Sequence, residues 1–230
     1  MKTIGLIGGM SWESSLLYYR LINQGVQQRL GGLHSAELLM HSVDFAPIEN
    51  LQHSGDWEGA SKILIDAARR LEAGGADFFL IGTNTMHQVA AAVSAAVDIP
   101  LLHIADATAQ ALINNQVRRV GLLGTAFTME LEFYRERIER NGIEIVVPEL
   151  HDRQMVHDII YQELCRGTID DDSREVYLAI IGRLGEQQID GVILGCTEIG
   201  MLIDSCHTDM PLYDTTAIHA AQAVDYALQT

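Results

Sequence analysis

The sequence predicts an α/β protein built from two similar halves, each with a parallel sheet. This prediction rests on two similar sequence segments, Asp77–Thr85 and Asp190–Glu198. Each is an apolar run that ends in glycine, followed by a small nucleophilic side chain and a polar cluster. The nucleophilic positions are Thr83 and Cys196, which lie 196 − 83 = 113 residues apart. Two copies of half a chain indicate a duplicated α/β unit rather than an array of short repeats.

Two further landmarks repeat at nearly the same distance. Lys2–Gly8 resembles Arg118–Gly124, and Ile99–Leu101 resembles Met210–Leu212. Apolar runs that alternate with amphipathic stretches of helical spacing fill the sequence between these landmarks. Strands are expected at Thr3–Ile7, Glu37–Val43, Asp77–Ile81, Val120–Leu123, Ile143–Val147 and Gly191–Leu194. Helices are expected at Trp12–Leu30, Trp57–Leu71, about His87–Ala96, Met129–Arg140, near Gln154–Arg166, near Arg174–Gln187 and Thr215–Leu228.

The composition excludes several classes of function. The chain has 230 residues, of which 48% are hydrophobic and 20% charged, and its net charge is −16 from 31 acidic and 15 basic residues. Nucleic acids and anionic membrane surfaces are disfavoured, because both bind through clustered Lys and Arg. No apolar run approaches a membrane span and no signal peptide is visible. Three cysteines without a CxxC pair indicate free thiols in a reducing compartment, so a soluble cytoplasmic protein is expected.

Four positions directly follow predicted strands, namely Gly8, Thr83, Thr125 and Cys196. Ligands of parallel sheets bind at the carboxyl ends of the strands. These positions are therefore candidates for one shared site. Cys196 lies where backbone N–H groups at a helix start would favour a thiolate, although a buried structural cysteine has the same local pattern. The matching position of Thr83 favours a functional interpretation.

The other polar clusters have both a structural and a functional interpretation. Thr83, Asn84 and Thr85 are good helix N-caps, and the same groups can bind a carboxylate and an amine. Gly8–Ser11 resembles an anion-binding turn that opens a helix, and Gly124–Thr128 would do the same in the second half. The first turn has neither the GxGxxG spacing nor the P-loop lysine, which makes a nucleotide improbable. A small carboxylate fits better.

No cofactor is expected. The nine histidines include no tight metal-ligand set, and His87, near Thr83, is interpreted as a satisfied structural histidine. Pyridoxal phosphate needs a lysine for its Schiff base. The chain has only Lys2 and Lys62, and neither follows a strand. The other cysteines, Cys165 and Cys206, have no strand-end context.

At this point the motifs resemble the aspartate/glutamate racemase family. The resemblance is carried by Ile7–Glu13, Thr83–His87, Val120–Thr125, Ile193–Glu198 and Asp214–His219, in order along nearly the whole chain. It implies a racemase that works without pyridoxal phosphate, on a small amino acid. It also implies two pseudo-symmetric Rossmann-like domains, with the active site in the inter-domain cleft. The expected domains are 1–101 with 211–230, and 102–210; a homodimer is suggested by the resemblance alone.

The resemblance also assigns roles to residues. In this family two cysteines, one from each domain, flank the substrate α-carbon and act as acid and base. Carried over, Cys196 is the acid/base of the second domain and Thr83 occupies the place of the other. The expected substrate-binding residues are Met10, Ser11, Gln52, Asn84, Thr85, Thr125, Thr128, Thr197 and Glu198.

Two departures from the family pattern matter for function. Thr83 stands where the family usually has cysteine, so we expect efficient α-proton exchange on L-substrates and poor use of D-substrates. No Lys or Arg occurs between Ala36 and Ser61, where aspartate-specific relatives have an arginine that binds the second carboxylate. Gln52 and neutral neighbours fill that place, with Arg166 as a further candidate from the second domain. We therefore expect neutral substrates such as homoserine in addition to aspartate and glutamate.

Two alternatives remain open. One is another reaction of the same superfamily, such as hydantoin racemisation or cis–trans isomerisation of a dicarboxylate. The other is a non-catalytic amino-acid-binding protein that kept the site and lost one thiol.

Overall fold

A computed structural model describes residues 1–229, and the chain divides into two compact units. The first unit is Met1–Ile104 together with the chain from His219 onward, and the second is Ala105–Ile218. The predicted boundaries were 101/102 and 210/211. The chain returns to the first unit later than predicted, because Leu212–Asp214 pairs with a strand of the second sheet. Each unit is described by itself below.

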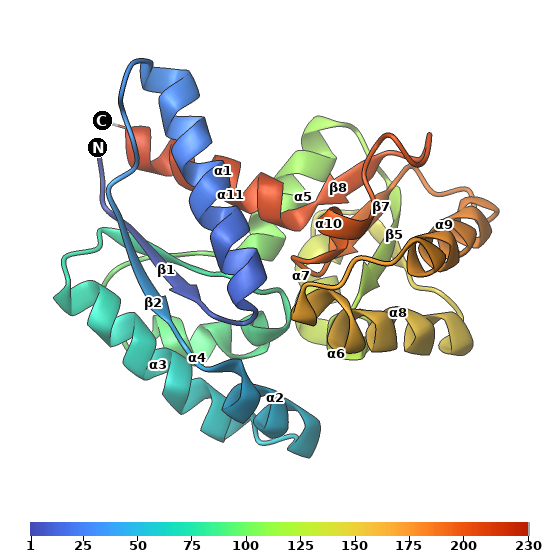
Figure 1. The fold of residues 1–230 in the computed structure, drawn as a ribbon, viewed down its shortest axis with the longest axis horizontal. Coiled ribbons are helices and arrows are strands. Elements are labelled where there is room, and N and C mark those ends of the chain that lie inside the picture. Colours follow the sequence, from blue (N-terminus) through green and yellow to red (C-terminus); the bar gives the residue numbers. More distant parts are fainter. Residues whose placement is uncertain (230) are drawn as a thin grey trace. The chain divides into compact units, whose positions relative to one another are not determined.

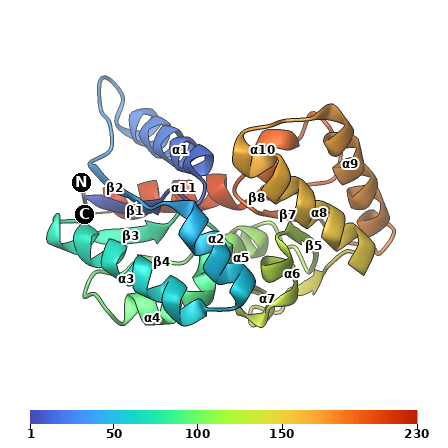
Figure 2. The ribbon, with the colours of Figure 1, turned by 60° about the horizontal axis from the view of Figure 1, so that its bottom comes forward.

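The first unit is a three-layer structure around a four-stranded parallel sheet (Figures 1 and 2). The strand order is β2-β1-β3-β4, and every neighbouring pair is parallel. The strands are β1 (Ile4–Gly8), β2 (Leu38–Ser42), β3 (Phe78–Ile81) and β4 (Leu101–Leu102). The helices are α1 (Trp12–Leu30), α2 (Phe45–Ser54), α3 (Trp57–Ala73) and α4 (Ala90–Ser94), with a 3₁₀ turn at Thr85–Val89 and the later part of α11 (Thr215–Leu228).

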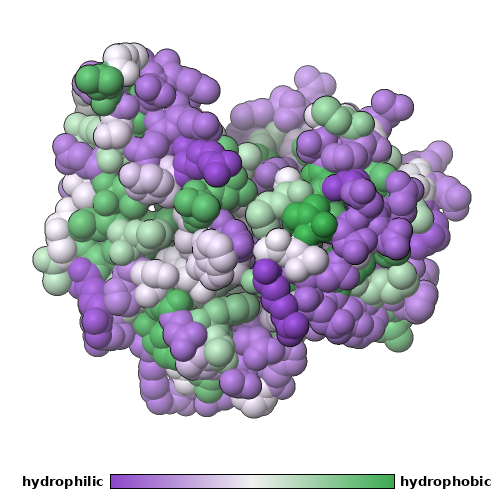
Figure 3. Space-filling model, in the orientation of Figure 1, coloured by the Kyte–Doolittle hydropathy of each residue, from purple (hydrophilic) through white to green (hydrophobic). Residues whose placement is uncertain are grey.

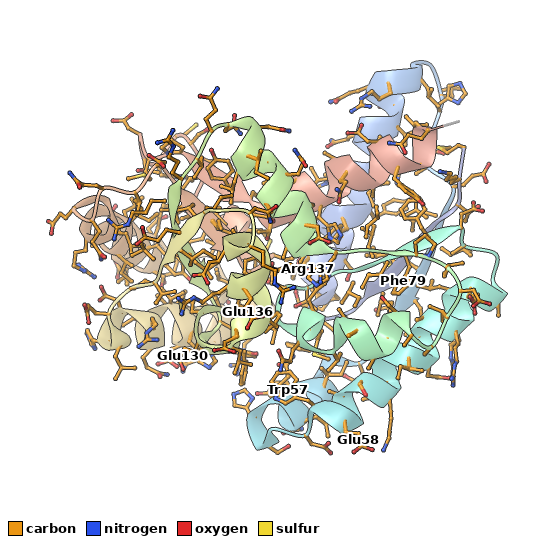
Figure 4. All side chains as sticks on the ribbon, turned by 180° about the vertical axis from the view of Figure 1, so that it is seen from behind. Trp57, Glu58, Phe79, Glu130, Glu136 and Arg137 are labelled. Atoms are coloured by element: carbon orange, nitrogen blue, oxygen red, sulfur yellow. The ribbon has the colours of Figure 1, made fainter. Side chains whose placement is uncertain are left out.

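Alternation along the buried strands supplies a core on each face of this sheet. Phe78 and Leu80 point to the side covered by α1 and α11, where they pack with Ile22 and Val224. Phe79 points to the opposite side and packs with residues of α3 (Figure 4). Because both faces of the central strands β1 and β3 are covered, these two strands are continuous apolar runs, as is usual for a parallel sheet.

The second unit repeats this plan. Its strand order is β6-β5-β7-β8, again with every pair parallel. The strands are β5 (Arg119–Gly124), β6 (Glu144–Val146), β7 (Val192–Gly195) and β8 (Leu212–Asp214). The helices are α5 (Ile104–Asn114), α6 (Ala126–Glu130), α7 (Glu132–Glu139), α8 (Leu150–Gln162), α9 (Asp171–Gly185) and α10 (Ile199–Leu202), with a 3₁₀ turn at Leu164–Arg166.

The two sheets confirm the duplication predicted from sequence. Replacing β1, β2, β3 and β4 by β5, β6, β7 and β8 converts one strand order into the other. The repeated prolines also take equivalent places: the carbonyl of Pro100 accepts a hydrogen bond from Phe79 N (3.0 Å), and that of Pro211 accepts one from Val192 N (2.8 Å). Each proline thus leads into the edge strand of its sheet.

Several predicted helices differ from the observed ones. The helix predicted at Met129–Arg140 is two helices, α6 and α7, because the backbone at Leu131 is extended. The helix predicted from about His87 begins as the 3₁₀ turn at Thr85 and becomes α-helical only over Ala90–Ser94. Helices α2, α5 and α10 were not predicted. In the second unit, the Arg137 guanidinium fixes α7 to α5 through two contacts with Asp106, at 2.5 and 2.8 Å (Figure 4).

Apolar side chains also gather on the outside of the first unit, over β2 and the adjoining side of α1 (Figure 3). Trp12, Leu16, Tyr19 and Met40 are exposed there and line a groove of about 360 Å³. The groove arises because β2 is an edge strand whose outer part α1 leaves uncovered. Within residues 1–229, no helix is long and apolar enough to cross a membrane.

Candidate active site

Each sheet has one topological switch point, and the predicted site residues follow the strands that form it. In the first sheet the chain leaves β1 toward β2 on one side and returns to β3 on the other. The carboxyl ends of β1 and β3 therefore diverge into different loops, which is where open α/β sheets bind ligands. In the second sheet β5 and β7 form the equivalent point. The predicted residues Ser11 and Thr83 follow the first pair, and Thr125 and Cys196 follow the second.

The first switch point is closely packed around glycines. Gly82 donates its N–H to the carbonyl of Ile7 (2.8 Å), so β1 and β3 stay together to their ends. Gly9 has a φ of +93°, and a methyl group added there would lie 2.1 Å from the carbonyl oxygen of Val43. Only glycine meets both conditions. This turn therefore requires the glycine seen in the sequence.

The turn after β1 opens α1, as predicted. Ser11 is the N-cap, and its hydroxyl accepts a hydrogen bond from Ser14 N (3.4 Å). Gly9 N donates to the hydroxyl of Ser15 (2.7 Å). One N–H group of the turn proposed for anion binding, that of Gly9, thus donates to a serine of α1. The side chain of Met10 is buried in the apolar core beneath α3.

The segment after β3 is held by its backbone. Thr83, Asn84 and Thr85 are buried, with Thr83 the most exposed at 9%. Asn84 precedes the 3₁₀ turn without a side-chain capping bond, so the capping interpretation is wrong for this residue. The ring of His87 donates from Nδ1 to the carbonyl of Thr83 (2.8 Å) and accepts at Nε2 from Ile104 N (3.3 Å). As predicted, His87 is a satisfied structural histidine.

Gln52 lies on α2 next to this segment. Its side chain is buried, and its amide nitrogen contacts the sulfur of Met86 at 3.0 Å. Gln52 therefore adjoins the Thr83–Thr85 turn through Met86. Gln52 thus provides a neutral amide in the stretch between Ala36 and Ser61, which has no Lys or Arg.

The second switch point is also closely packed around glycines. A methyl group at Gly124 would lie 2.9 Å from the carbonyl oxygen of Gly195, and one at Gly195 would lie 2.9 Å from that of Leu123. Beyond β5, Thr125 caps α6: its hydroxyl accepts from Thr128 N and contacts the Thr128 hydroxyl, both at 3.3 Å. Thr125 and Thr128 thus have a structural role at the helix start.

Cys196 immediately follows β7, and its side chain is held by a carboxylate. Its thiol donates to Oε2 of Glu198 (2.9 Å), and the hydroxyl of Thr197 donates to the same oxygen (2.8 Å). Burial, the charge of Glu198 and the neighbouring Cys165 raise the pKa of Cys196 well above its ordinary value. The sequence predicted a favoured thiolate, which is wrong for this arrangement. The helix after β7 begins only at Ile199 and spans four residues, and a carboxylate faces the sulfur instead.

The surroundings of Cys196 contain further groups that disfavour negative charge. Tyr177 of α9 is fully buried, and burial together with the nearby Cys196 raises its pKa. Burial also raises the pKa of Cys165, and the negative charge of Glu198 raises it further. Cys165 is therefore close enough to the site to affect it electrostatically. No sequence pattern indicates this proximity, because Cys165 lies 196 − 165 = 31 residues before Cys196, in the 3₁₀ turn.

A second buried cluster in the first unit was also missed. His219 accepts at Nδ1 from the hydroxyl of Tyr18 (2.8 Å) and donates at Nε2 to the carbonyl of Leu102 (2.9 Å). Burial lowers the pKa of His219 to about 4. The ring of His87 lies 4.3 Å from that of His103 and 6.1 Å from that of His219. Residues so far apart in sequence give no periodic signal.

The predicted residues thus form two sets, one in each unit. The first set is Met10, Ser11, Gln52, Thr83, Asn84 and Thr85, and the second is Thr125, Thr128, Cys196, Thr197 and Glu198. That both sets bind one substrate stays a prediction. Arg166, the further candidate, is exposed in the 3₁₀ turn after α8. Among the described residues, no three His, Cys, Asp or Glu side chains are grouped to hold a metal ion.

Comparison with known proteins shows which family the chain resembles in sequence and in fold. The family described as Asp/Glu/hydantoin racemase matches residues 7–223. The broad-specificity amino-acid racemase RacX of Bacillus subtilis (strain 168) is 25% identical over 96% of each chain. A crystal structure of a candidate Asp/Glu racemase from Yersinia pestis is 52% identical over the full length of both chains, with a TM-score of 0.91. That of an aspartate racemase homologue from Pyrococcus horikoshii OT3 is 34% identical, also over both full chains, with a TM-score of 0.86.

Proposed function

The chain belongs to the Asp/Glu/hydantoin racemase family, and from this premise we propose that it interconverts the two hands of a small amino acid. The observation that carries the proposal is the equivalence of Thr83 and Cys196. Each follows the third strand of a four-stranded sheet, at the switch point of that sheet. In this proposal Cys196 removes and returns the α-proton, and Thr83 stands at the second acid/base position.

The polar groups beside these two residues bind the substrate in this proposal. Asn84 and Thr85 directly follow Thr83, and Thr197 directly follows Cys196. Hydrogen bonds to the α-carboxylate stabilise the negative charge that develops when the α-proton leaves. Ser11 and Thr125 support this set from the neighbouring loops, where both already cap helices. Their removal would act through the position of α1 or α6.

The unlike residues predict a reaction that treats the two hands differently. A threonine hydroxyl is a far weaker base than a thiolate, and it needs an activating base. The two enantiomers have equal free energy, so kcat/KM for net racemisation must be the same in both directions. The difference therefore appears in exchange without inversion, in which Cys196 removes an α-proton and returns a solvent proton to the same face. We expect rapid exchange on the L-substrate and slow exchange on the D-substrate.

The proposed substrates are acidic or short polar amino acids. No Lys or Arg lies between Ala36 and Ser61, and the buried polar side chain in that stretch is the amide of Gln52. A neutral amide binds a hydroxyl or an amide as well as it binds a carboxylate. Homoserine is therefore expected alongside aspartate and glutamate. The breadth of RacX, as its name describes it, supports the same expectation.

The proposal needs no pyridoxal phosphate. Lys62 is an exposed residue of α3 and pairs with Glu58 at 2.8 Å. Lys2 precedes β1, at the amino end of the strand, and lies over the ring of Tyr226. Neither lysine lies at a strand end where Thr83 or Cys196 is found. All three cysteines are free, which supports a location in the reducing cytoplasm. Cell fractionation would test this part of the proposal.

The test is α-proton exchange in D₂O, followed by NMR without added pyridoxal phosphate. We expect the wild type to exchange L-aspartate, L-glutamate or L-homoserine. Cys196→Ser should reduce this exchange by about 10²- to 10⁴-fold, the range for a general acid/base. An unchanged rate in Cys196→Ser would refute the assignment. Absence of exchange in the wild type, together with thermal stabilisation by an amino acid, would favour the non-catalytic binding protein, the alternative that the missing second thiol suggests.

A further inference from the structure

We propose that Thr215 and Thr216, the first two residues of α11, are positioning residues for Cys196. This inference rests on the proposed function and deepens it. The two threonines belong to Asp214–His219, a segment that carries part of the family resemblance and has no role in the proposed function. They directly follow β8, and β8 pairs with β7, the strand that Cys196 follows.

The hydroxyls of the two threonines bind the backbone on either side of Cys196. The Thr215 hydroxyl donates to the carbonyl of Leu194, two residues before the cysteine (2.8 Å). The Thr216 hydroxyl donates to the carbonyl of Thr197, the residue after the cysteine (3.4 Å). Both threonines are 0% exposed, so bulk water does not compete for these carbonyls. One turn of α11 therefore holds the backbone that carries the thiol at two points.

The start of α11 is itself held by the carboxylate of Asp214. This carboxylate accepts from Thr216 N (2.8 Å) and from Ala217 N (3.2 Å), and thereby caps the helix. It also lies against α10, because a methyl group added at Gly200 would be 2.5 Å from Oδ2 of Asp214. Helix α10 is the one that follows Cys196. The same carboxylate thus fixes the position of the threonines relative to the turn that they bind.

The first unit makes an equivalent contact with different groups. Helix α5 begins at Ile104, shortly after the edge strand β4, as α11 begins after the edge strand β8. Ile104 N donates to Nε2 of His87, and Nδ1 of His87 donates to the carbonyl of Thr83. In each unit, the helix after the edge strand is therefore bonded to the turn after the third strand. The two units share this contact although they build it from unlike side chains.

A fixed backbone at Cys196 matters because proton transfer depends on distance. The sulfur must reach the α-hydrogen of the substrate, and a misplacement of about 1 Å can slow a reaction by about 10²-fold. Removing the Thr215 hydroxyl loosens the backbone before the thiol and leaves the proposed substrate-binding side chains unchanged. The loss should therefore appear in kcat and spare KM.

The test is Thr215→Val, which keeps the shape of the side chain and removes its hydroxyl. We expect kcat for L-substrate exchange in D₂O to fall about tenfold, with KM within about twofold of the wild type. Thr215→Ser retains the hydroxyl and should keep at least about half of the wild-type kcat. Thr216→Val should lower kcat less, by about threefold, because its hydrogen bond is longer.

The matched control is Thr108→Val in α5. Thr108 is also 0% exposed in the second unit, and its hydroxyl accepts from the hydroxyl of Tyr134 (3.4 Å). This variant loses a buried hydroxyl in the same way and should keep the wild-type kcat. Urea unfolding establishes that each variant is folded in the assay, and Thr216→Val carries the test if Thr215→Val does not fold.

Three results would overturn the inference. The first is a wild-type kcat in the folded Thr215→Val variant, or in Thr216→Val where that variant carries the test. The second is a kcat for Thr215→Ser as low as that of Thr215→Val, because the hydroxyl would then not be the cause. The third is an equal loss in Thr108→Val, because any buried hydroxyl would then have the same effect.

A second measurement needs no turnover. Cys196 is 8% exposed, so its alkylation by iodoacetamide at one fixed pH reports how firmly its turn is held. Mass spectrometry of its peptide should show alkylation about tenfold faster in Thr215→Val and unchanged in Thr108→Val. An equal rate in Thr215→Val and the wild type overturns the inference, even if the protein racemises amino acids. Faster alkylation in a protein that exchanges no amino acid refutes the proposed function and leaves the hold on Cys196 intact.

Discussion

The two units share a backbone plan and differ in what is held at the end of the third strand. In the first unit the backbone is anchored: His87 binds the carbonyl of Thr83 at 2.8 Å. In the second unit the side chain is anchored: Glu198 binds the thiol of Cys196 at 2.9 Å. The duplication therefore preserved the frame and let the chemistry of the two strand ends diverge. One end became a thiol–carboxylate pair and the other a hydroxyl on a fixed backbone.

The largest expected effect comes from making the two strand ends alike. Thr83→Cys supplies a second thiol, so we expect D-substrate exchange and net racemisation in both directions to rise about 10²-fold. Thr83→Ser keeps a hydroxyl and is the matched control, with rates within a few-fold of the wild type. Chiral chromatography of the products and NMR in D₂O measure both quantities. If D-exchange stays at the wild-type level in Thr83→Cys, the difference between the ends has another origin.

The next effect concerns the buried histidines, which distinguish the first unit. Burial lowers the pKa of His219 from 6.5 to about 4, so the unfolded chain binds more protons than the folded one between these values. The free energy of unfolding should therefore decrease as pH falls from 6.5 to about 4, by about 2–3 kcal/mol.

Urea unfolding at the two ends of this pH window measures that effect. His219→Gln can still accept from Tyr18 and donate to Leu102, but it does not titrate. Its stability should depend less on pH than that of the wild type. His34→Gln, at an exposed position, is the control and should keep the wild-type dependence. An equal pH dependence in His219→Gln and the wild type would contradict the account.

The smallest effect tests the packing of the two switch points. A methyl group at Gly195 would lie 2.7 Å from a carbon of Leu122 and 2.9 Å from the Leu123 carbonyl oxygen, whereas at Gly82 the nearest atom is 3.1 Å away. Gly195→Ala should therefore cost about 1–3 kcal/mol, and Gly82→Ala less. Gly182→Ala in α9 meets nothing within 4 Å and should stabilise the helix by about 0.5–1 kcal/mol. Thermal unfolding ranks the three, and the reverse order for Gly82 and Gly195 would refute the packing comparison.

The strands and the duplication could be predicted because apolar runs that end in glycine are local signals. The third strand of each sheet, with Thr83 or Cys196 behind it, was found in this way. Two of the shortest elements could not be predicted, because the two-residue strand β4 and the four-residue helix α10 have no measurable periodicity. The point at which the chain returns to the first unit was predicted too early. The segment of β8 was assigned to the first unit, but it forms a strand of the second sheet by pairing with β7.

The chemistry of Cys196 could be predicted only in part. The sequence pattern predicted its position at a strand end, and it showed that Thr197 and Glu198 follow directly. The orientation of the Glu198 carboxylate was not, because side chains two residues apart point toward each other only in a tight turn. The approach of Cys165 and Tyr177 depends on the packing of α9 and a 3₁₀ turn against β7, which no local pattern encodes. The thiolate prediction failed for this reason.

The most direct test of the central claim is the ratio of initial α-proton exchange rates for the two hands of one substrate. The purified protein would be incubated in D₂O with L- or D-aspartate, at concentrations well below saturation, and the loss of the α-proton followed by NMR. The account predicts exchange that is at least about 10²-fold faster for the L-form, and L-exchange that is about 10²- to 10⁴-fold slower in Cys196→Ser. Equal rates for the two hands would contradict it, because they would show that Thr83 matches the thiol of Cys196.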